Sequence, residues 1–276
     1  MRGIYTAGVL DAFMEHDIEF DGVIGVSAGA IHGCSFVSRQ KGRSIRYYKK
    51  YVNDSRYMSL RSLIKTGDYV GAEFCYHEIP EKLDVYDFEA FNANETKFYG
   101  VATNVATGKA EYFHFKDMKK EIDMLRASAS LPLVSRLVEF GGKKYLDGGC
   151  SDSIPVQKFR EMGYENNVVV LTREAGYKKK PQNVKLLKLK YRKYPEFIKT
   201  MANRHVVYNN AVKEIELLER RKKVVIIRPE KALEIGRLEK NPEKAQEIYD
   251  IGYQDGLKAM RKVKEMLERW NYANLL

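Results

Sequence analysis

The residues best suited to chemistry in this chain are a serine and an aspartate, each beside glycines. Ser27 lies in the stretch DGVIGVSAGAIH, between Gly25 and Gly29. Glycine on either side lets the backbone turn sharply from a strand into a helix without Cβ clashes, and it leaves the serine hydroxyl exposed at the strand end. The N–H groups of the following helix, which begins near Ala28, favour developing negative charge. Ser27 is therefore a candidate nucleophile.

A nucleophilic serine needs a base, and the sequence offers two arrangements. The order Ser27, Asp147, His205 matches the Ser-Asp-His order of α/β-hydrolases, but only 26 residues precede Ser27, too few for the strands and oxyanion loop that come first in that fold. Ordinary core or surface roles explain all five histidines. The other candidate base is Asp147 in the stretch YLDGG, where a turn presents a carboxylate at a strand end, although Asp-Gly also marks plain turns. Such a carboxylate is a poor base at neutral pH unless burial raises its pKa.

The elements that must position these residues follow from the periodicity of apolar side chains. We expect helices at 4–16, after residue 27, at 195–221 and at 242–270, and strands at 23–26, 98–103, 110–115, 167–172 and 222–228. The last two strands are short β-branched runs, typical of sheets covered on both faces. Strands that alternate with helices predict an α/β architecture, with a helical C-terminal extension packed onto the sheet.

Length and composition exclude several classes of protein. A chain of 276 residues suits one large domain, or one domain with an extension. No apolar run reaches 18 residues, and the start meets Asp11 too soon for a signal peptide, so we expect a soluble, cytoplasmic protein. Cys34, Cys75 and Cys150 are far apart, which excludes CxxC spacing and suits a reducing compartment. We expect no structural zinc.

The net charge of +11 predicts attraction to polyanions, either nucleic acid or an anionic membrane face. It is densest at 178–193, KKKPQNVKLLKLKYRK, where leucines among the lysines could lie on a lipid surface; a solvated linker is the alternative. Reversible electrostatic adsorption would be helped by Lys258, Arg261, Lys262 and Lys264. No helix-turn-helix, RNP or zinc-finger signature is present, so we expect no nucleic acid partner.

Four blocks, in order along the chain, resemble the patatin-like phospholipase family. They are GVSAG at 25–29, VATNVATGK at 101–109, RASASLPLV at 126–134 and DGGCSDSIPV at 147–156. The resemblance covers about residues 2–175. It implies a three-layer α/β/α acyl hydrolase domain at 1–175, and the charge and periodicity of the remaining residues predict a basic linker and a mainly helical extension at 176–276. It also implies a Ser-Asp dyad without metal or cofactor, in which Ser27 is the nucleophile and Asp147, followed by Gly148 and Gly149, is the base.

The N-terminus departs from the family pattern. The family's oxyanion hole is a loop of the form Gly-Gly-Gly-x-Arg-Gly after the first strand, and Met1, Arg2 and Gly3 match only its last three positions. We expect that the start codon has been assigned too late, with a real truncation as the alternative; the upstream codons would decide. Loss of one oxyanion donor typically costs about 10²- to 10³-fold in rate. The resemblance therefore implies a serine hydrolase of phospholipids, lysophospholipids or neutral acyl esters, in which Arg2, Gly3 and Ala28 position the oxyanion, or else a catalytically impaired lipid-binding or regulatory protein.

Overall fold

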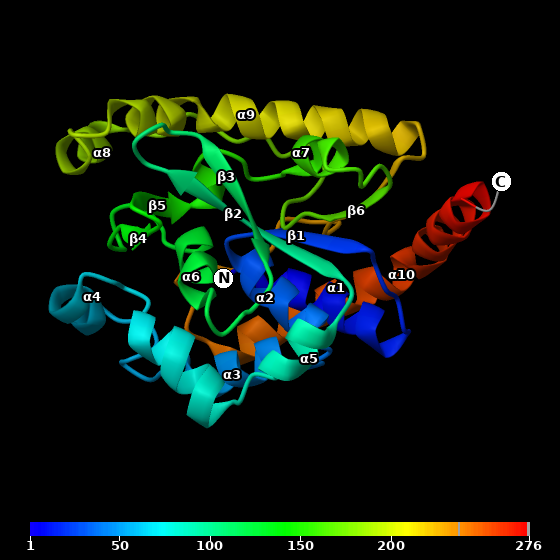
Figure 1. The fold of residues 1–276 in the computed structure, drawn as a ribbon, viewed down its shortest axis with the longest axis horizontal. Coiled ribbons are helices and arrows are strands. Elements are labelled where there is room, and N and C mark those ends of the chain that lie inside the picture. The colour runs from blue at the N-terminus through cyan, green and yellow to red at the C-terminus, as the bar shows by residue number, and fades with distance from the viewer. Residues whose placement is uncertain (237, 275–276) are drawn as a thin grey trace.

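A mixed sheet lies at the centre of the computed structural model, which describes residues 1–236 and 238–274 (Figure 1). Within these residues the sheet has the order β1-β2-β5-β4, and β3 also pairs with β2. A further parallel pair is formed by β6 and β7. The strands are β1 (Gly22–Val26), β2 (Lys97–Asn104), β3 (Ala110–Phe115), β4 (Val138–Phe140), β5 (Lys143–Asp147), β6 (Asn167–Val170) and β7 (Val224–Ile227).

Strand β2 sets the position of the two residues singled out from the sequence. β1 runs parallel to β2 with Val26 opposite Val101, and β5 runs antiparallel to it with Asp147 opposite Ala102. β3 pairs with β2 over the same stretch, so it occupies the other edge. β1 and β5 therefore run towards each other along one edge of β2 and end at neighbouring residues of it, which brings the residues after Val26 close to Asp147.

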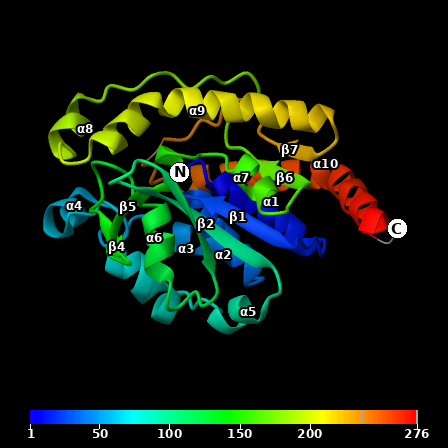
Figure 2. The same ribbon diagram turned by 45° about the horizontal axis from the view of Figure 1, so that its top comes forward.

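Helices cover both sides of the strands (Figures 1 and 2). The α-helices are α1 (Ile4–Glu15), α2 (Ala28–Val37), α3 (Arg43–Tyr51), α4 (Leu60–Thr66), α5 (Phe88–Ala93), α6 (Ile122–Ser128), α7 (Val156–Glu161), α8 (Lys185–Lys190), α9 (Pro195–Arg220) and α10 (Pro242–Asn274). A π-helix, η1 (Phe74–Leu83), precedes α5, and a 3₁₀ turn, η2 (Gly148–Cys150), follows β5. α1, α2 and α10 lie on one side of the strands, and α7 and α9 lie on the other.

Strand β7 shows this two-sided burial residue by residue. Val225 and Ile227 belong to the core cluster shared with α1 and α10, whereas Val224 and Ile226 pack in the cluster built with α9. Side chains alternate between the two faces of a strand, so both faces of β7 are covered by helices. The predicted α/β class, the three-layer arrangement and the C-terminal helices are confirmed, and the predicted helix and strand ranges agree with the structure to within a few residues.

The C-terminal helix packs closely on α1. Gly8 and Gly252 stand where the two backbones meet: a Cβ on Gly8 would overlap Tyr249 O, and one on Gly252 would overlap Tyr5 O. The Tyr249 hydroxyl donates to Asp11 Oδ2 at 2.6 Å. α9 packs against Leu146 of β5, in line with the expected packing of the extension onto the sheet, and β7 pairs with β6 in a second sheet. The packing of α10 on α1 was not indicated by the sequence pattern.

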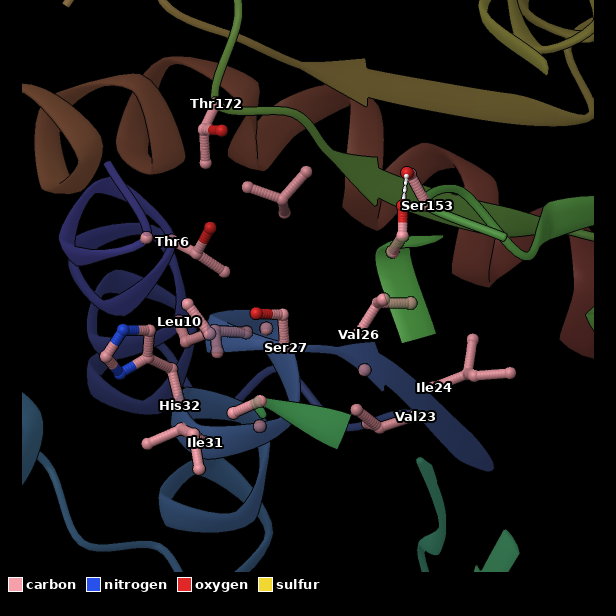
Figure 3. A pocket seen from close by; sticks show the side chains of 18 of the residues that line it. Thr6, Leu10, Val23, Ile24, Val26, Ser27, Ile31, His32, Ser153 and Thr172 are labelled. Atoms are coloured by element: carbon pink, nitrogen blue, oxygen red, sulfur yellow. Dashed lines mark hydrogen bonds between the residues drawn. The ribbon is translucent and has the colours of Figure 1, made fainter. Parts of the chain in front are cut away.

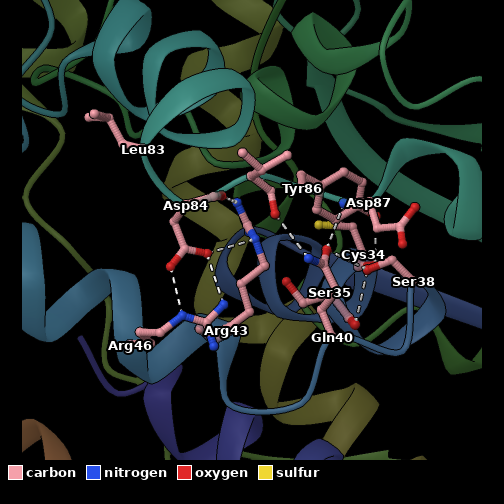
Figure 4. A network of polar contacts seen from close by, with 12 residues as sticks. Cys34, Ser35, Ser38, Gln40, Arg43, Arg46, Leu83, Asp84, Tyr86 and Asp87 are labelled. Carbon is pink, nitrogen blue, oxygen red and sulfur yellow. Dashed lines mark hydrogen bonds and ion pairs between the residues drawn. The ribbon is translucent and has the colours of Figure 1, made fainter.

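A partly buried network of polar contacts holds the segment after η1 against α2 and α3 (Figure 4). Asp84 accepts from the Arg46 guanidinium at 2.7 and 3.0 Å, and its carbonyl accepts from Arg43 at 2.9 Å. The Tyr86 hydroxyl donates to Cys34 O at 2.8 Å. Arg43, Cys34 and Tyr86 line the large cavity described below, so this network closes one of its walls.

Candidate active site

Ser27 occupies the turn between β1 and α2 in a conformation that side-chain-bearing residues rarely adopt. Its φ is 56° and its ψ is −123°. Gly25 permits this turn, because a Cβ there would come within 2.5 Å of Ala30 Cα, where the first turn of α2 crosses β1. A Cβ on Gly29 would meet only open space, so packing gives no reason for that glycine. Strain at a strand-to-helix turn is typical of an exposed nucleophilic serine.

Asp147 is held directly against this serine. The Ser27 hydroxyl donates to Asp147 Oδ2 at 2.5 Å, and the Gly149 N–H donates to Oδ1 at 2.7 Å. The Thr103 hydroxyl donates to the Asp147 carbonyl at 2.8 Å. A Cβ on Gly148 would overlap the Val101 carbonyl, which explains why the turn after the aspartate needs glycine. The structure thus brings the two predicted residues into hydrogen-bond contact.

The surroundings of Asp147 raise the pKa of its carboxyl above the ordinary value. Burial is the main cause, since the residue is only 2% exposed. Hydrogen bonds from Ser27 and Gly149 and the positive charges of Arg204 and Lys179 act in the opposite direction and offset part of this rise. A carboxylate with a raised pKa is a stronger base than one on the surface.

Sequence reasoning missed Arg204 as part of this site. It lies on α9, and its Nε donates to the Gly149 carbonyl. Nothing in the local pattern around Arg204 distinguishes it from the many other basic residues of the chain. Only the packing of α9 across η2 reveals its place beside the aspartate.

The end of α6 and the loop after it support both residues. The Ser27 N–H donates to Ser128 Oγ at 3.1 Å, and the Asp147 N–H donates to the Ser130 carbonyl at 2.8 Å. Both serines belong to the block RASASLPLV, which was singled out only for its resemblance to the family. The structure adds its physical role, which is to hold the two strand ends in place.

The residues predicted to position the oxyanion also gather here. A Cβ on Gly3 would overlap the Ala28 Cβ, so the stretch before α1 lies against the first residue of α2. The N–H groups of Ala30 and Ile31 donate to the Ser27 carbonyl at 3.0 and 3.2 Å. The N–H groups of Ala28 and Gly29 precede this first intrahelical turn and form the partly positive end of α2 beside Ser27. Arg2, like Gly3, lines the cavity onto which Ser27 opens.

No histidine takes the place of Asp147 at Ser27 in the described part of the chain. His205 Nδ1 lies 3.1 Å from the Ala202 carbonyl, on its own helix. His32 is buried with Nδ1 at 3.0 Å from Ser44 Oγ, and burial, with the N-terminal amine, lowers its pKa to about 4. It is therefore neutral near pH 7. The contact of Ser27 with Asp147 fits the dyad rather than the triad arrangement.

Ser27 faces a cavity of about 1240 Å³ that extends between β1 and β6 (Figure 3). Apolar side chains such as Leu10, Ile24 and Val26 line it, together with polar groups such as Ser153 and Thr172 and several charged side chains. The apolar part of this lining suits an acyl chain, and the polar part suits the ester and its head group. Within residues 1–236 and 238–274, no three His, Cys, Asp or Glu side chains gather as metal ligands, and no helix has the length and apolarity to cross a membrane.

Comparison with known proteins places this site in a family. A model of patatin-like phospholipase matches residues 1–160, and a model of a domain of unknown function (DUF6363) matches residues 194–268. The uncharacterized protein YjjU of Escherichia coli (strain K12) is 30% identical over 177 residues, which cover 62% of this chain and 49% of YjjU. The 1-acylglycerol-3-phosphate O-acyltransferase Pnpla3 of Mus musculus is 30% identical over 139 residues, 48% of this chain and 32% of that protein.

The alignments thus span about half of one relative and a third of the other. The family model covers more than half of this chain, since it matches residues 1–160, and the matched residues include both Ser27 and Asp147. The chain belongs to the patatin-like phospholipase family, whose members are typically lipid acyl hydrolases or acyltransferases.

Proposed function

We propose that the protein is a serine acyl ester hydrolase that cleaves lipids through an acyl-serine intermediate. The observation that carries the proposal is the 2.5 Å hydrogen bond from Ser27 Oγ to Asp147 Oδ2, made at a strained strand-to-helix turn that opens onto an apolar cavity. The buried carboxylate and its raised pKa support its assignment as the base. Dyad chemistry of this kind uses the side chains alone and requires no metal ion.

In the first half-reaction, Ser27 Oγ attacks the carbonyl carbon of the ester while its proton passes to Asp147 Oδ2. The bond from that carbon to the alcohol oxygen then breaks, and the alcohol takes the proton from Asp147 as it leaves. The acyl group stays esterified to Ser27. A base within hydrogen-bond reach of the nucleophile contributes about 10²- to 10⁴-fold to such a step.

In the second half-reaction, a water molecule attacks the acyl carbon and gives a proton to Asp147. The bond to Ser27 Oγ breaks, the serine regains its proton and the fatty acid leaves. An alcohol that takes the place of water produces acyl transfer by the same steps. Both outcomes lie within the chemistry of the family.

The oxyanion formed in each half-reaction lies next to the first turn of α2. Ala28 is the first residue of that helix, Gly3 lies against it, and Arg2 lines the same cavity. We assign Ala28 as an oxyanion donor, and Arg2 and Gly3 as the residues that position the oxyanion. Loss of one such donor typically slows the reaction by about 10²- to 10³-fold.

Labelling with a fluorophosphonate probe tests the assignment of the nucleophile. We expect the probe to label Ser27. Labelling should be abolished in Ser27→Ala and should be slower in Asp147→Asn than in the wild type. Ser153→Ala is the matched control, because Ser153 lines the same cavity but bonds to the Gly149 carbonyl rather than to Asp147. Labelling that persists in Ser27→Ala would remove Ser27 from the mechanism. A folded protein that binds fatty acid but neither labels nor hydrolyses esters would favour the impaired, lipid-binding alternative.

We also propose reversible contact with an anionic membrane surface through the basic segment 178–193. The second basic group, Lys258 to Lys264 on α10, lies towards the other end of the long axis of the molecule from α8 (Figures 1 and 2). It therefore does not extend the same surface, contrary to our expectation that the two groups act together.

The cysteines Cys34, Cys75 and Cys150 are all unpaired, which suits the cytoplasmic location expected from the sequence.

A further inference from the structure

The most exposed large hydrophobic side chains in the described part of the chain occur on two short helices. They are Ile64 (86% exposed) and Leu60 (68%) on α4, and Leu189 (74%) and Leu186 (67%) on α8. Single exposed hydrophobic residues are common on protein surfaces, whereas exposed apolar side chains that gather in one region are typical of interaction sites.

Helix α4 is built to hold its apolar side chains away from the protein. Ser59 caps its start by accepting from the Ser62 N–H at 2.8 Å, and Gly67, with φ of 82°, ends it. Leu60 and Ile64 are four residues apart and share one face of the helix, whereas Ser62 is buried on the other. The short helix is well formed, so the exposure of its apolar face does not come from poor folding.

Helix α8 has the same design. Leu187 is buried with Tyr191, Phe197 and Met201, and it anchors the helix. Leu186 and Leu189, three residues apart, project from the opposite side. The basic segment is therefore not a free linker at this point, and its exposed leucines are held in a fixed place.

One loop ties the two helices together. This loop, residues 129–137, joins α6 to β4, and its Arg136 pairs with Asp68, just after α4, at 2.9 Å. The Leu133 carbonyl of the loop accepts from Lys190 of α8 at 3.1 Å. Figures 1 and 2 show α4 and α8 at the same end of the molecule. The same loop therefore contacts both helices, and we call their exposed faces together the α4–α8 surface.

The charge of this surface identifies the partner that it fits. Its exposed polar side chains include five cations and no carboxylate: Arg61, Lys65, Lys185, Lys188 and Lys190. Apolar tips among basic groups match the interface of a bilayer that contains anionic lipid, where the tips enter the acyl region and the cations meet phosphate groups.

The α4–α8 surface also borders the cavity that contains Ser27. Met58 and Val70, which pair at the base of the α4 loop, line that cavity, and so does Leu131 of the 129–137 loop. Gln182, just before α8, lines it as well. A membrane that met α4 and α8 would therefore lie beside the entrance through which a lipid reaches the serine.

We propose that the α4–α8 surface inserts Leu60, Ile64, Leu186 and Leu189 into an anionic phospholipid bilayer and so places the cavity entrance against its lipid substrate. The substrate part of this proposal rests on the proposed hydrolase function, whereas the binding part does not. The apolar part of the binding should persist at about 1 M salt. At that salt concentration the Debye length falls to about 3 Å, so contacts between exposed charges are screened and the electrostatic part is weakened.

Vesicle co-sedimentation with the inactive Ser27→Ala protein tests the binding part without any need for catalysis. Vesicles of phosphatidylcholine, alone or mixed with phosphatidylglycerol in equal parts, are the probes. We expect binding to the mixed vesicles, and a loss of about tenfold or more in each of Ile64→Asp and Leu189→Asp, because each puts a charge where an apolar tip enters the bilayer. The matched control is Leu217→Asp, an exposed leucine near the far end of α9, which should bind as the parent does.

Turnover in the active protein tests the link to the substrate. Ile64→Asp and Leu189→Asp should slow hydrolysis of vesicle lipid about tenfold and leave that of a soluble short-chain ester unchanged. Vesicle binding by Ser27→Ala with no turnover in the active protein would refute the hydrolase proposal alone. Binding that is unchanged in both Asp variants, or that is equal for neutral and anionic vesicles, would overturn the membrane proposal. A wild-type dimer that analytical ultracentrifugation no longer detects in the Asp variants would also overturn the membrane proposal, because it would assign the surface to a second copy of the chain.

Discussion

Replacement of Asp147 by asparagine separates the catalytic role of this residue from its structural one. The amide fits the same space and can keep both hydrogen bonds: its oxygen accepts from the Gly149 N–H, and its nitrogen donates to Ser27 Oγ in place of the present arrangement. The amide cannot take a proton from the serine. We therefore expect kcat/KM for a soluble ester to fall about 10²- to 10⁴-fold, the usual contribution of a general base.

The same change should leave the fold as stable at pH 7 or make it more stable. Burial raises the pKa of Asp147, so the folded protein binds this proton more tightly than the unfolded chain does. The carboxyl has a pKa of about 4 in the unfolded chain. The free energy of unfolding therefore falls as the pH rises from that value through the higher pKa of the folded state, and it stays lower at all pH values above the folded-state pKa. Each tenfold change in the acid constant corresponds to about 1.4 kcal/mol. An uncharged amide avoids this loss.

Urea unfolding at pH 4 and pH 7, together with ester turnover, measures both effects. Asparagine followed by Gly148 is prone to deamidation back to aspartate, so mass spectrometry of the variant must accompany the kinetics. Ser27→Ala is the reference, because it removes the nucleophile and keeps the buried carboxylate. The reasoning is refuted if Asp147→Asn keeps more than about a tenth of the activity, against the 10²-fold loss expected for a base. It is also refuted if the variant is less stable than the wild type by more than about 1.4 kcal/mol at pH 7, which would make the carboxylate chiefly structural.

Three further predictions concern the same site. Since the base must be ionised, the acid limb of the pH dependence of kcat/KM should lie above the ordinary aspartate value near 4, and a limb at or below that value would contradict the raised pKa of Asp147. Arg204→Gln removes a positive charge that lowers this pKa, so the limb should move to higher pH, whereas a merely structural role would change the rate at all pH values alike. Gly25→Ala should cost about 1–3 kcal/mol in unfolding free energy and abolish fluorophosphonate labelling, because the new methyl group meets the backbone of Ala30; wild-type labelling would show that α2 can shift.

Local patterns predicted the elements of the site better than their assembly. The flanking glycines of Ser27 predicted the turn from β1 into α2, and the Asp-Gly pair predicted the turn at Asp147, because both depend on backbone conformation within a few residues. The distance between the two residues depends instead on the register of β1 and β5 on β2, in which Val26 and Asp147 meet adjacent β2 residues. No local pattern contains that register.

Surface features were harder still to predict from the chain. The lysine and leucine content of 178–193 indicated a lipid-binding segment, but not that Leu187 would be buried while Leu186 and Leu189 stay exposed. Residues 43–93 have mixed patterns that predicted no element, so α4 and its apolar face were missed. Net charge likewise grouped the lysines of α10 with those of α8, although the fold separates them, because composition contains no information about which end of a molecule a helix occupies.

The proposed division of the chain near residue 175 has to accommodate contacts that cross it. β7 pairs with β6, α10 packs against α1 where Gly252 meets Tyr5, and Arg204 bonds to the carbonyl of Gly149 beside the proposed base. Buried surface shared between two segments contributes to the stability of both, so the second segment supports the fold of the first as well as its chemistry. Its basic helix α8 also belongs to the surface that we propose meets the membrane. We therefore propose that residues 176–276 are a part of the enzyme that completes the β6–β7 pair, tunes the base and positions the cavity entrance, rather than an independent module joined by a linker.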